Sequence, residues 1–210
     1  MSEFKLWCFG ESGNAYKAAL MLELCGLDWE PVKVEFFKGE TRSPEYKANI
    51  NEMGEVPVLE HKGKRLTQSG IIMDYLAAHT GKFGWNSEDE RREIYRWMLF
   101  DNHKFTGNIA TLRYLVALMK TPENDVTKFL KGRVINAMKV LELHLATQDF
   151  MACGRMTIAD ISLSGYLFYG DELPFEITPH VKAWSERIRA LPGWKHPYDL
   201  MPRALDRPEL

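Results

Sequence analysis

The 210-residue chain has a formal net charge of −2, from 27 basic and 29 acidic side chains, and 45% of its residues are hydrophobic. This composition is typical of a folded globular protein, and neither charge sign forms a run that would attract nucleic acid. No stretch reaches the roughly 18 apolar residues that a membrane span requires, and the N-terminus does not resemble a signal peptide. We therefore expect a cytoplasmic protein that binds neither nucleic acid nor membrane.

The first 80 residues alternate between strand and helix patterns. An apolar run over residues 4–9 predicts a strand, helical periodicity follows over 14–25, and Gly26 suits the position after the helix. Alternating apolar residues over 29–36 predict a second strand, and this order favours a right-handed parallel unit. The segments VPVLEH (56–61) and RLTQS (65–69) then predict a hairpin, which a helix over 70–79 follows.

The second half of the chain shows only helical patterns. Two glycines and a capping Asn86 or Ser87 mark a boundary within residues 80–90. Helices are predicted over 89–119, 126–146 and 178–190, with a further one from Thr157, where Thr157 and Asp160 are spaced as a capping box. The tail contains Pro197, Pro202 and Pro208, so it cannot hold a long helix and is expected to lie against the surface.

Cysteine and histidine are placed without the spacing of a metal site. Cys8, Cys25 and Cys153 show no Cys-x-x-Cys pattern, and their odd number does not suit a disulfide framework, so we expect buried thiols. The six histidines include no pair at helical ligand spacing and have no cysteine partner nearby. The sequence therefore predicts a protein without a metal ion.

The turn Ser12-Gly13-Asn14, at the junction of the first strand and helix, has two interpretations. Ser12 and Asn14 are both good helix caps, and a structural role alone would explain them. Alternatively, the free N–H groups and the positive end of the helix dipole bind an anion, to which a hydroxyl or amide adds a donor. A thiolate is one anion that such a turn would stabilise.

Two later features have similar double interpretations. Pro57, within Val56-Pro57-Val58, is either an ordinary edge proline or part of a cis arrangement that frees the backbone of Val56 to pair with an extended peptide-like ligand. Gln68 and Ser69 are either a loop residue and a helix cap, or a second helix start presented to a carboxylate. Together, the functional interpretations describe three contact points for an acidic peptide.

These segments, in this order and spacing, resemble the cytosolic glutathione transferase family. The segments that carry the resemblance are SGNAYKAALMLELCGLDWE, NINEMGEVPVLE, the pair QS before IIMDYLA, and MTIADISLSGYL. The resemblance covers essentially the whole chain. It implies a thioredoxin-like α/β N-terminal domain (residues 1–80), a linker (81–87) and an all-helical C-terminal domain (88–210) that contains the electrophile site.

The resemblance also implies which residues contact glutathione. Val56 would pair through its backbone with the cysteinyl part, with Pro57 in cis, and Gln68 and Ser69 would hold the γ-glutamyl carboxylate. Lys38, in the loop after the second strand, is a weaker candidate for the glycyl carboxylate. Glutathione would be a co-substrate, and no metal would take part.

The family's thiol-activating position falls on the turn after the first strand. Ser12 would donate to the sulfur of glutathione as in the serine-type classes, and Asn14 would be a second donor or the alternative activator. The strand ends in Phe9-Gly10 without a tyrosine, and Tyr16 lies a full turn into the helix. The chain therefore resembles bacterial-like members related to the theta, zeta, beta and nu classes more than the tyrosine-type classes.

The segment RWMLFDNHKFT in the helical half would border the electrophile site. His103, Lys104 and Phe105 are the candidates there, although an aromatic stripe at helical spacing is more often part of a core. The His103-Lys104 pair is similar to one found in some bacterial members, with a spacing from Trp97 about one turn shorter. Pocket shape does not follow from such a stripe, so the sequence does not name the electrophile.

We therefore predict a glutathione transferase that adds the thiolate of glutathione to a hydrophobic electrophile. Glutathione itself is the nucleophile, so the protein need only position and ionise the thiol. Two alternatives remain: glutathione-dependent reduction of peroxides or disulfides, and a non-catalytic interaction module on the same fold. The resemblance further implies a homodimer and a role in detoxification.

Overall fold

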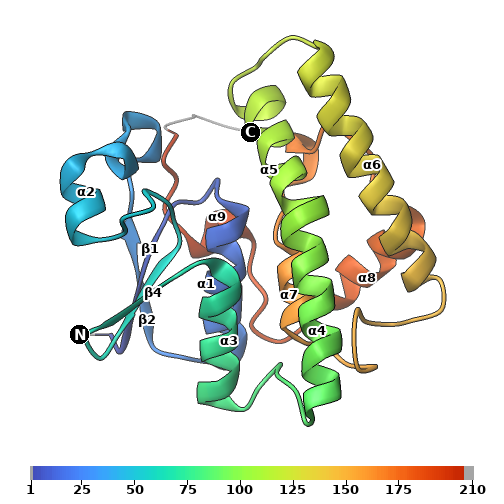
Figure 1. Cartoon of the computed structure of the whole chain (residues 1–210), viewed down its shortest axis with the longest axis horizontal. Coiled ribbons are helices and arrows are strands. Elements are labelled where there is room, and N and C mark those ends of the chain that lie inside the picture. Colours follow the sequence, from blue (N-terminus) through green and yellow to red (C-terminus); the bar gives the residue numbers. More distant parts are fainter. Residues whose placement is uncertain (1, 206–210) are drawn as a thin grey trace. The chain divides into compact units, whose positions relative to one another are not determined.

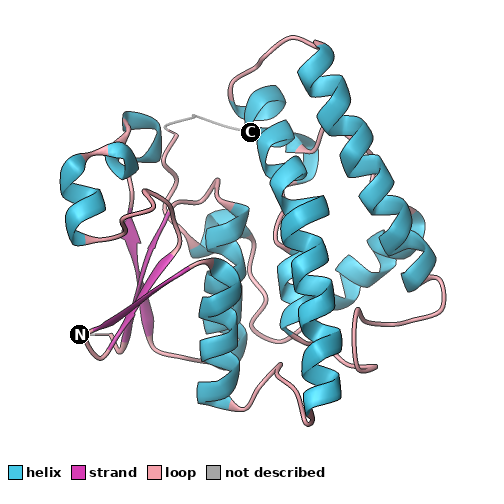
Figure 2. Ribbon diagram, in the orientation of Figure 1, coloured by secondary structure: helices cyan, strands magenta, loops and turns pink. Residues whose placement is uncertain are grey.

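The computed structural model describes residues 2–205, which form two compact units. Unit 1 combines residues up to Lys82 with the C-terminal segment from Pro192, and unit 2 spans Phe83 to Leu191. Strands occur in unit 1, whereas the regular structure of unit 2 is helical (Figures 1 and 2). The predicted fold class, a thioredoxin-like α/β domain and a helical domain, is confirmed.

Unit 1 is built on a four-stranded mixed sheet in the order β2-β1-β3-β4. Strands β1 and β2 are parallel, and the other neighbouring pairs are antiparallel. This topology confirms the predicted parallel unit followed by a hairpin. The strands are β1 (Phe4–Cys8), β2 (Trp29–Lys33), β3 (Val58–His61) and β4 (Lys64–Thr67).

Helix α1 (Gly13–Cys25) forms the centre of unit 1. It contacts β1 and α3 (Ser69–Thr80), and ten of its thirteen residues are buried. A helix that is covered on several sides is expected to be apolar around most of its circumference, which explains why most residues of α1 are apolar. Gly26 ends α1 in the left-handed region, with a φ of 69°, as predicted.

The segment between β2 and β3 differs from the prediction. The expected strand over 29–36 ends at Lys33, and the chain continues through two 3-10 turns, η1 (Phe36–Lys38) and η2 (Glu40–Arg42). A short helix, α2 (Pro44–Asn49), follows, and the Ser43 side chain caps it by accepting from the Tyr46 N–H. The Ser43-Pro44 pair is a helix-start signal that the sequence interpretation overlooked.

Unit 2 contains the predicted helices. The expected helix over 89–119 is one helical stretch in which two π-helical segments interrupt regular α-helix. In order, the elements of unit 2 are α4 (Glu88–Phe100), η3 (Asp101–Thr106), α5 (Gly107–Arg113), η4 (Tyr114–Leu118), α6 (Asp125–Leu145), α7 (Ile158–Ser164), η5 (Gly170–Glu172) and α8 (Pro179–Arg189). The first four form the long helical stretch. No helix among residues 2–205 is long and apolar enough to cross a membrane.

The predicted capping box at the start of α7 is confirmed and lies in the core of unit 2. Thr157 caps the helix, and the Asp160 carboxylate accepts from the Thr157 N–H at 2.9 Å. The same carboxylate also accepts from the Met151 N–H at 2.8 Å and from the Trp184 indole N–H at 2.9 Å. Burial raises the pKa of Asp160 to about 6, against the effect of these hydrogen bonds. The contacts support a structural role for Asp160.

The C-terminal segment corrects the predicted domain assignment. The sequence placed all of 88–210 in the helical domain, but the chain from Pro192, including α9 (Pro197–Leu200), belongs to unit 1. The Gly10 N–H donates to the Pro202 carbonyl at 2.7 Å, and the Tyr16 hydroxyl donates to the Lys195 carbonyl at 2.9 Å. Sequence periodicity carries no signal for such non-local hydrogen bonds. The sequence therefore predicts the boundary within residues 80–90 but not the return of the chain to unit 1 at Pro192.

Candidate active site

The strand register brings the three sequence features of unit 1 to one edge of the sheet. Trp7, near the end of β1, is paired with Val58, the first residue of β3. Pro57, which directly precedes Val58, therefore lies at the edge of the sheet where β1 leads into the Ser12 turn. Val58 is in turn paired with Thr67, the last residue of β4, which places Gln68 at the same edge. Ser12 and the two later features, which follow it by 44 or more positions in the sequence, thus lie along one edge of the sheet.

Ser12 caps helix α1 and keeps a proton to donate. Its hydroxyl oxygen accepts from the Ala15 N–H at 3.2 Å, and the residue is only 8% exposed. Because this bond uses a lone pair, the O–H hydrogen is left to donate to another acceptor. Capping and donation are therefore compatible, and the two interpretations of Ser12 do not exclude each other.

Asn14 is the second residue of α1 and is half-buried, so it is less enclosed than Ser12. Its side chain forms no hydrogen bond with a described residue. The first turn of α1 contains no acidic residue that would repel an anion. The turn therefore offers a partly enclosed hydroxyl and a more accessible amide.

The peptide bond between Val56 and Pro57 is cis, as the resemblance implied. Among residues 2–205, the N–H and C=O of Val56 form no hydrogen bond, so both are available to an extended ligand. The preceding carbonyl, that of Glu55, accepts from the Tyr46 hydroxyl at 3.1 Å and from the Asn51 amide at 2.9 Å. These contacts fix the backbone on the N-terminal side of Val56.

Helix α3 begins without a side-chain cap. Gln68 occupies the cap position with a φ of 66° and makes no capping hydrogen bond, and Ser69 is the first helical residue. The cap role considered for Ser69 is therefore wrong. The first turn also lacks acidic residues, so its N–H groups favour an anionic partner. The Gln68 amide donates to Glu55 Oε2 at 3.1 Å.

Lys38 ends the short turn η1, which follows β2 at the same edge of the sheet. Its side chain is 74% exposed, and its ammonium lies 3.3 Å from Glu35 Oε2. Lys33 and Lys38 together lower the pKa of Glu35. Lys38 therefore has an ionic partner but remains accessible from solvent.

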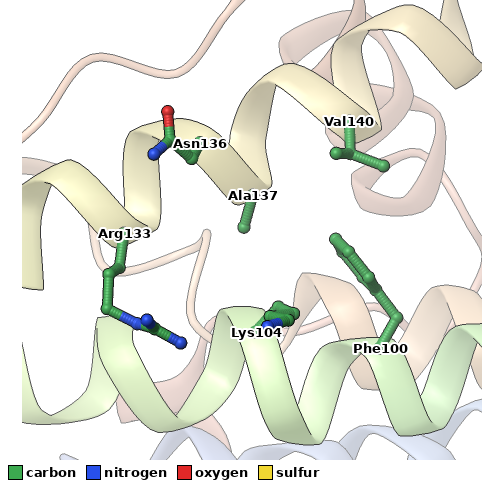
Figure 3. A pocket seen from close by; sticks show the side chains of 6 residues that line it. All are labelled: Phe100, Lys104, Arg133, Asn136, Ala137 and Val140. Atoms are coloured by element: carbon green, nitrogen blue, oxygen red, sulfur yellow. The ribbon is translucent and has the colours of Figure 1, made fainter.

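The three candidate residues for the electrophile site differ in their exposure to solvent. Phe105 is fully buried, which supports its interpretation as a core residue, whereas His103 and Lys104 are exposed. Lys104 lines a cavity of about 300 Å³ together with Phe100, Arg133 and Val140, between the long helical stretch and α6 (Figure 3). No sequence pattern predicts this cavity, because its walls come from helices about 30 residues apart.

The cysteines do not supply an alternative nucleophile at the turn. Cys8 and Cys25 are buried as expected, whereas Cys153 is only half-buried, and all three are free thiols. Burial raises the pKa of the Cys8 thiol to about 12, which keeps it protonated at neutral pH.

The fold is that of proteins that join a thioredoxin-like domain to a helical domain. Residues 2–78 match the family model described as "Glutathione S-transferase, N-terminal domain", and residues 108–192 match "Glutathione S-transferase, C-terminal domain". The chain therefore belongs to the glutathione S-transferase family, and its activity is that of a glutathione transferase.

Individual relatives agree with this assignment. The chain is 27% identical to "Glutathione S-transferase F14" of Arabidopsis thaliana, over 92% of this chain and 82% of that protein. A possible glutathione S-transferase from Rhodopseudomonas palustris shares 34% identity, with a TM-score of 0.87 over 93% of this chain and 98% of that one.

A further similar structure contains a ligand. It is the glutathione transferase URE2P8 of Phanerochaete chrysosporium with oxidized glutathione, which shares 25% identity with a TM-score of 0.85 over 95% of each chain. These comparisons do not favour the reductase or interaction-module alternatives.

Proposed function

We propose that the protein binds glutathione along the edge formed by Ser12, Val56-Pro57 and Gln68-Ser69, and that Ser12 activates the thiol as in the serine-type classes. The free N–H and C=O of Val56 beside the Ser12 turn carry this proposal. An extended peptide that pairs with this backbone is held along the edge between the two helix starts. The three sites then take three chemically different parts of one ligand.

Each part of glutathione has a matching contact. The γ-glutamyl carboxylate is bound by the uncapped start of α3, with Gln68 and Ser69 as side-chain donors. The cysteinyl residue pairs with the backbone of Val56. Lys38 attracts the glycyl carboxylate from its exposed position after β2.

The thiol is ionised by hydrogen bonding and by the dipole of α1. A free thiol has a pKa near 8.5, and lowering it by about 2 units requires roughly 2.7 kcal/mol of preferential stabilisation of the thiolate. The Ser12 O–H and the start of α1 are contacts that can supply this amount. The thiol proton passes to solvent, the sulfur forms a bond to the electrophilic carbon, and the leaving group departs with the bonding electrons.

The decisive experiment compares Ser12→Ala with Asn14→Ala. The pKa of bound glutathione is read from its thiolate absorbance, and kcat is followed against pH with a chloro-aromatic electrophile. Ser12→Ala is expected to raise this pKa and lower kcat at neutral pH by about 10- to 100-fold, with little change in glutathione binding. Asn14→Ala should leave both quantities close to those of the unmodified enzyme.

A matched control separates lost activation from a lost helix cap. Ser87 caps α4 through the same kind of bond, from the Glu90 N–H at 3.2 Å, in unit 2. Ser87→Ala should lower stability by about 1 kcal/mol without moving the thiol pKa. An unchanged pKa in Ser12→Ala together with a raised pKa in Asn14→Ala would assign the activation to Asn14.

We infer further that the enzyme works in the cytoplasm as a homodimer and detoxifies hydrophobic electrophiles. Large apolar side chains are exposed on α4 and α6 in unit 2, among them Leu99, Phe129 and Leu143 at 66%, 62% and 76% exposure. Contact with a second copy would remove them from water. Light scattering should give the mass of two chains, and a single-chain mass at micromolar concentration would contradict the homodimer.

A further inference from the structure

Two histidines and a carboxylate meet at the opposite edge of the sheet in unit 1. Phe4, the first residue of β1, is paired with His61, the last residue of β3, so this edge is the one remote from Ser12. Glu3 precedes β1, and His79 lies in the last turn of α3. One ligand atom from each of Glu3, His61 and His79 lies within 4.8 Å of the other two.

We propose that Glu3, His61 and His79 form a binding site for a divalent transition metal of the Zn²⁺ type. Two imidazoles and one carboxylate are a ligand set that suits Zn²⁺ and neighbouring metals such as Co²⁺ and Ni²⁺. A hard ion such as Mg²⁺ prefers a site made of oxygen ligands alone. Three protein ligands leave a fourth position to water.

One separation between ligand atoms is already close to that around a coordinated metal. Around a tetrahedral Zn²⁺, neighbouring ligand atoms lie roughly 3.3 Å apart. His61 Nε2 is 3.0 Å from Glu3 Oε1, which already matches this separation. Glu3 and His79 have exposed side chains, so small rotations can bring the third ligand atom into place.

His61 is a fixed, buried ligand. Only 2% of the residue is exposed, and its ring stacks on Phe4 with the centroids 4.0 Å apart. Its Nδ1 lies 2.7 Å from the Tyr75 hydroxyl. When Nε2 binds the metal, Nδ1 carries the ring proton and donates it to the Tyr75 oxygen, which is the outer contact that metal-bound histidines usually have.

His79 has its ring nitrogens free for a ligand. Its ring lies beside His61, with the centroids 5.1 Å apart, and stacks on Tyr75 at 6.1 Å. Neither ring nitrogen forms a hydrogen bond with a described residue. An imidazole placed beside a buried histidine and a carboxylate, and without a partner there, is the observation that points to a ligand.

Lys62 is the competitor for this site. Its ammonium lies 3.4 Å from Glu3 Oε1, the same oxygen that contacts His61. A bound cation must displace this ammonium from the carboxylate, so Lys62 weakens metal binding. The metal would link the start of β1, the end of β3 and the end of α3, which makes its expected effect a stabilisation of unit 1.

The test uses the full-length, untagged and chelator-treated chain, without glutathione, because a histidine tag or a free thiol would bind the metal. Calorimetric titration with Zn²⁺ should show one ion bound per chain. Thermal unfolding with Zn²⁺ present should show a higher Tm than without it. Co²⁺ should give the intense visible absorption of a tetrahedral site. No saturable binding, or binding without these signals, would overturn the proposal.

Variants at positions other than the buried His61 test the ligands. His79→Ala should remove binding, whereas His180→Ala, an exposed histidine in unit 2 that pairs with Glu142, should retain it. Tyr75→Phe should weaken affinity by about 10- to 100-fold, as loss of an outer contact does elsewhere. Lys62→Met should strengthen it. Equal affinity in His79→Ala and the unmodified chain would overturn the site.

Discussion

Gln68 has an unusual backbone for a residue with a long side chain. Its φ of 66° is positive, and its amide donates to Glu55 Oε2 at 3.1 Å, at the start of the uncapped helix α3. Positive φ is uncommon outside glycine and often marks a functional position. This geometry supports the proposal that the side chain is held ready for a ligand.

Gln68→Ala is expected to weaken glutathione binding without abolishing turnover. The hydrogen bond to a ligand carboxylate would be lost, which corresponds to about 1.5–3 kcal/mol and thus raises KM for glutathione roughly 10- to 150-fold. The thiolate contacts at Ser12 would remain, so kcat should change little. Steady-state kinetics with varied glutathione measure both constants.

Gln148→Ala provides the control for this variant, because Gln148 is an exposed residue of unit 2. It should leave KM unchanged. A fall in kcat at unchanged KM for Gln68→Ala would contradict a binding role and indicate a contact made only in the transition state.

For single residues, the sequence predicted possible roles better than it predicted contacts. Ser12 was recognisable because a small polar residue before an apolar helix has a limited set of roles. The absence of a cap on α3, in contrast, depends on the backbone of Gln68. His61 and His79 lie 18 positions apart, so no sequence pattern links them, and their proximity follows from strand pairing and the packing of α3.

Among the elements, helix α8 depends on a side chain from another helix for its N-terminal cap. The Glu142 carboxylate of α6 accepts from the His180 N–H at 3.0 Å and from the Val181 N–H at 3.2 Å. Burial acts to raise the pKa of Glu142, but its contacts with Thr178, His180 and Val181 lower it to about 2. The carboxylate therefore connects two helices of unit 2.

Replacing Glu142 with glutamine should make stability less dependent on pH. The folded pKa lies below the ordinary value of 4.5, so the stabilisation is complete above pH 4.5 and is lost as pH falls through 2. Glu142→Gln should cost about 1 kcal/mol at neutral pH, with the difference from the unmodified chain shrinking at acid pH. Urea unfolding of both chains between pH 7 and pH 3 measures this difference in the free energy of unfolding.

Glu123→Gln, which alters an exposed ion pair with Lys128, is the control and should cost less at neutral pH. A constant difference between Glu142→Gln and the unmodified chain at every pH would show that shape, and not charge, supports the cap.

Long periodic helices were predicted well because their apolar faces repeat over many residues. The capping box of α7 was also readable, since its residues are three positions apart. Helix α2 was missed because six residues give too few turns for a periodic signal. The π-helical segments η3 and η4 keep the chain helical, so the sequence pattern predicts one long helix and does not mark where its hydrogen bonding changes.

For the molecule as a whole, the C-terminal segment completes unit 1. Besides the contacts of Gly10 and Tyr16, the Glu11 carboxylate accepts from the Ala204 and Leu205 N–H groups at 3.0 and 3.1 Å. Lys195 also forms an ion pair with Glu23 of α1. These contacts lie on both sides of Ser12 in the sequence, so the segment supports the turn on which the proposed chemistry depends.

Gly10→Ala should disturb this docking. An added Cβ would lie 2.9 Å from Tyr198 Cδ1 and 3.3 Å from the Met201 carbonyl oxygen. Overpacking of this kind typically costs about 1–3 kcal/mol, so Tm should fall and the C-terminal segment should become sensitive to protease.

Gly132→Ala is the matched control, because a Cβ there meets no atom within 4 Å. Gly132 lies inside α6, so this change should stabilise the helix by about 0.5–1 kcal/mol. A stable Gly10→Ala variant with a protease-resistant segment would show that the turn can shift to accept the methyl group.

The order of the chain also sets an order of assembly. During synthesis the strands and helices of unit 1 leave the ribosome first, followed by the whole of unit 2, and only then residues 192–205. The amide groups that contact Glu11 and the carbonyl that accepts from Gly10 do not exist until that point. A nascent chain can therefore complete unit 2 before the C-terminal segment forms its hydrogen bonds with Gly10 and Glu11, next to the Ser12 turn.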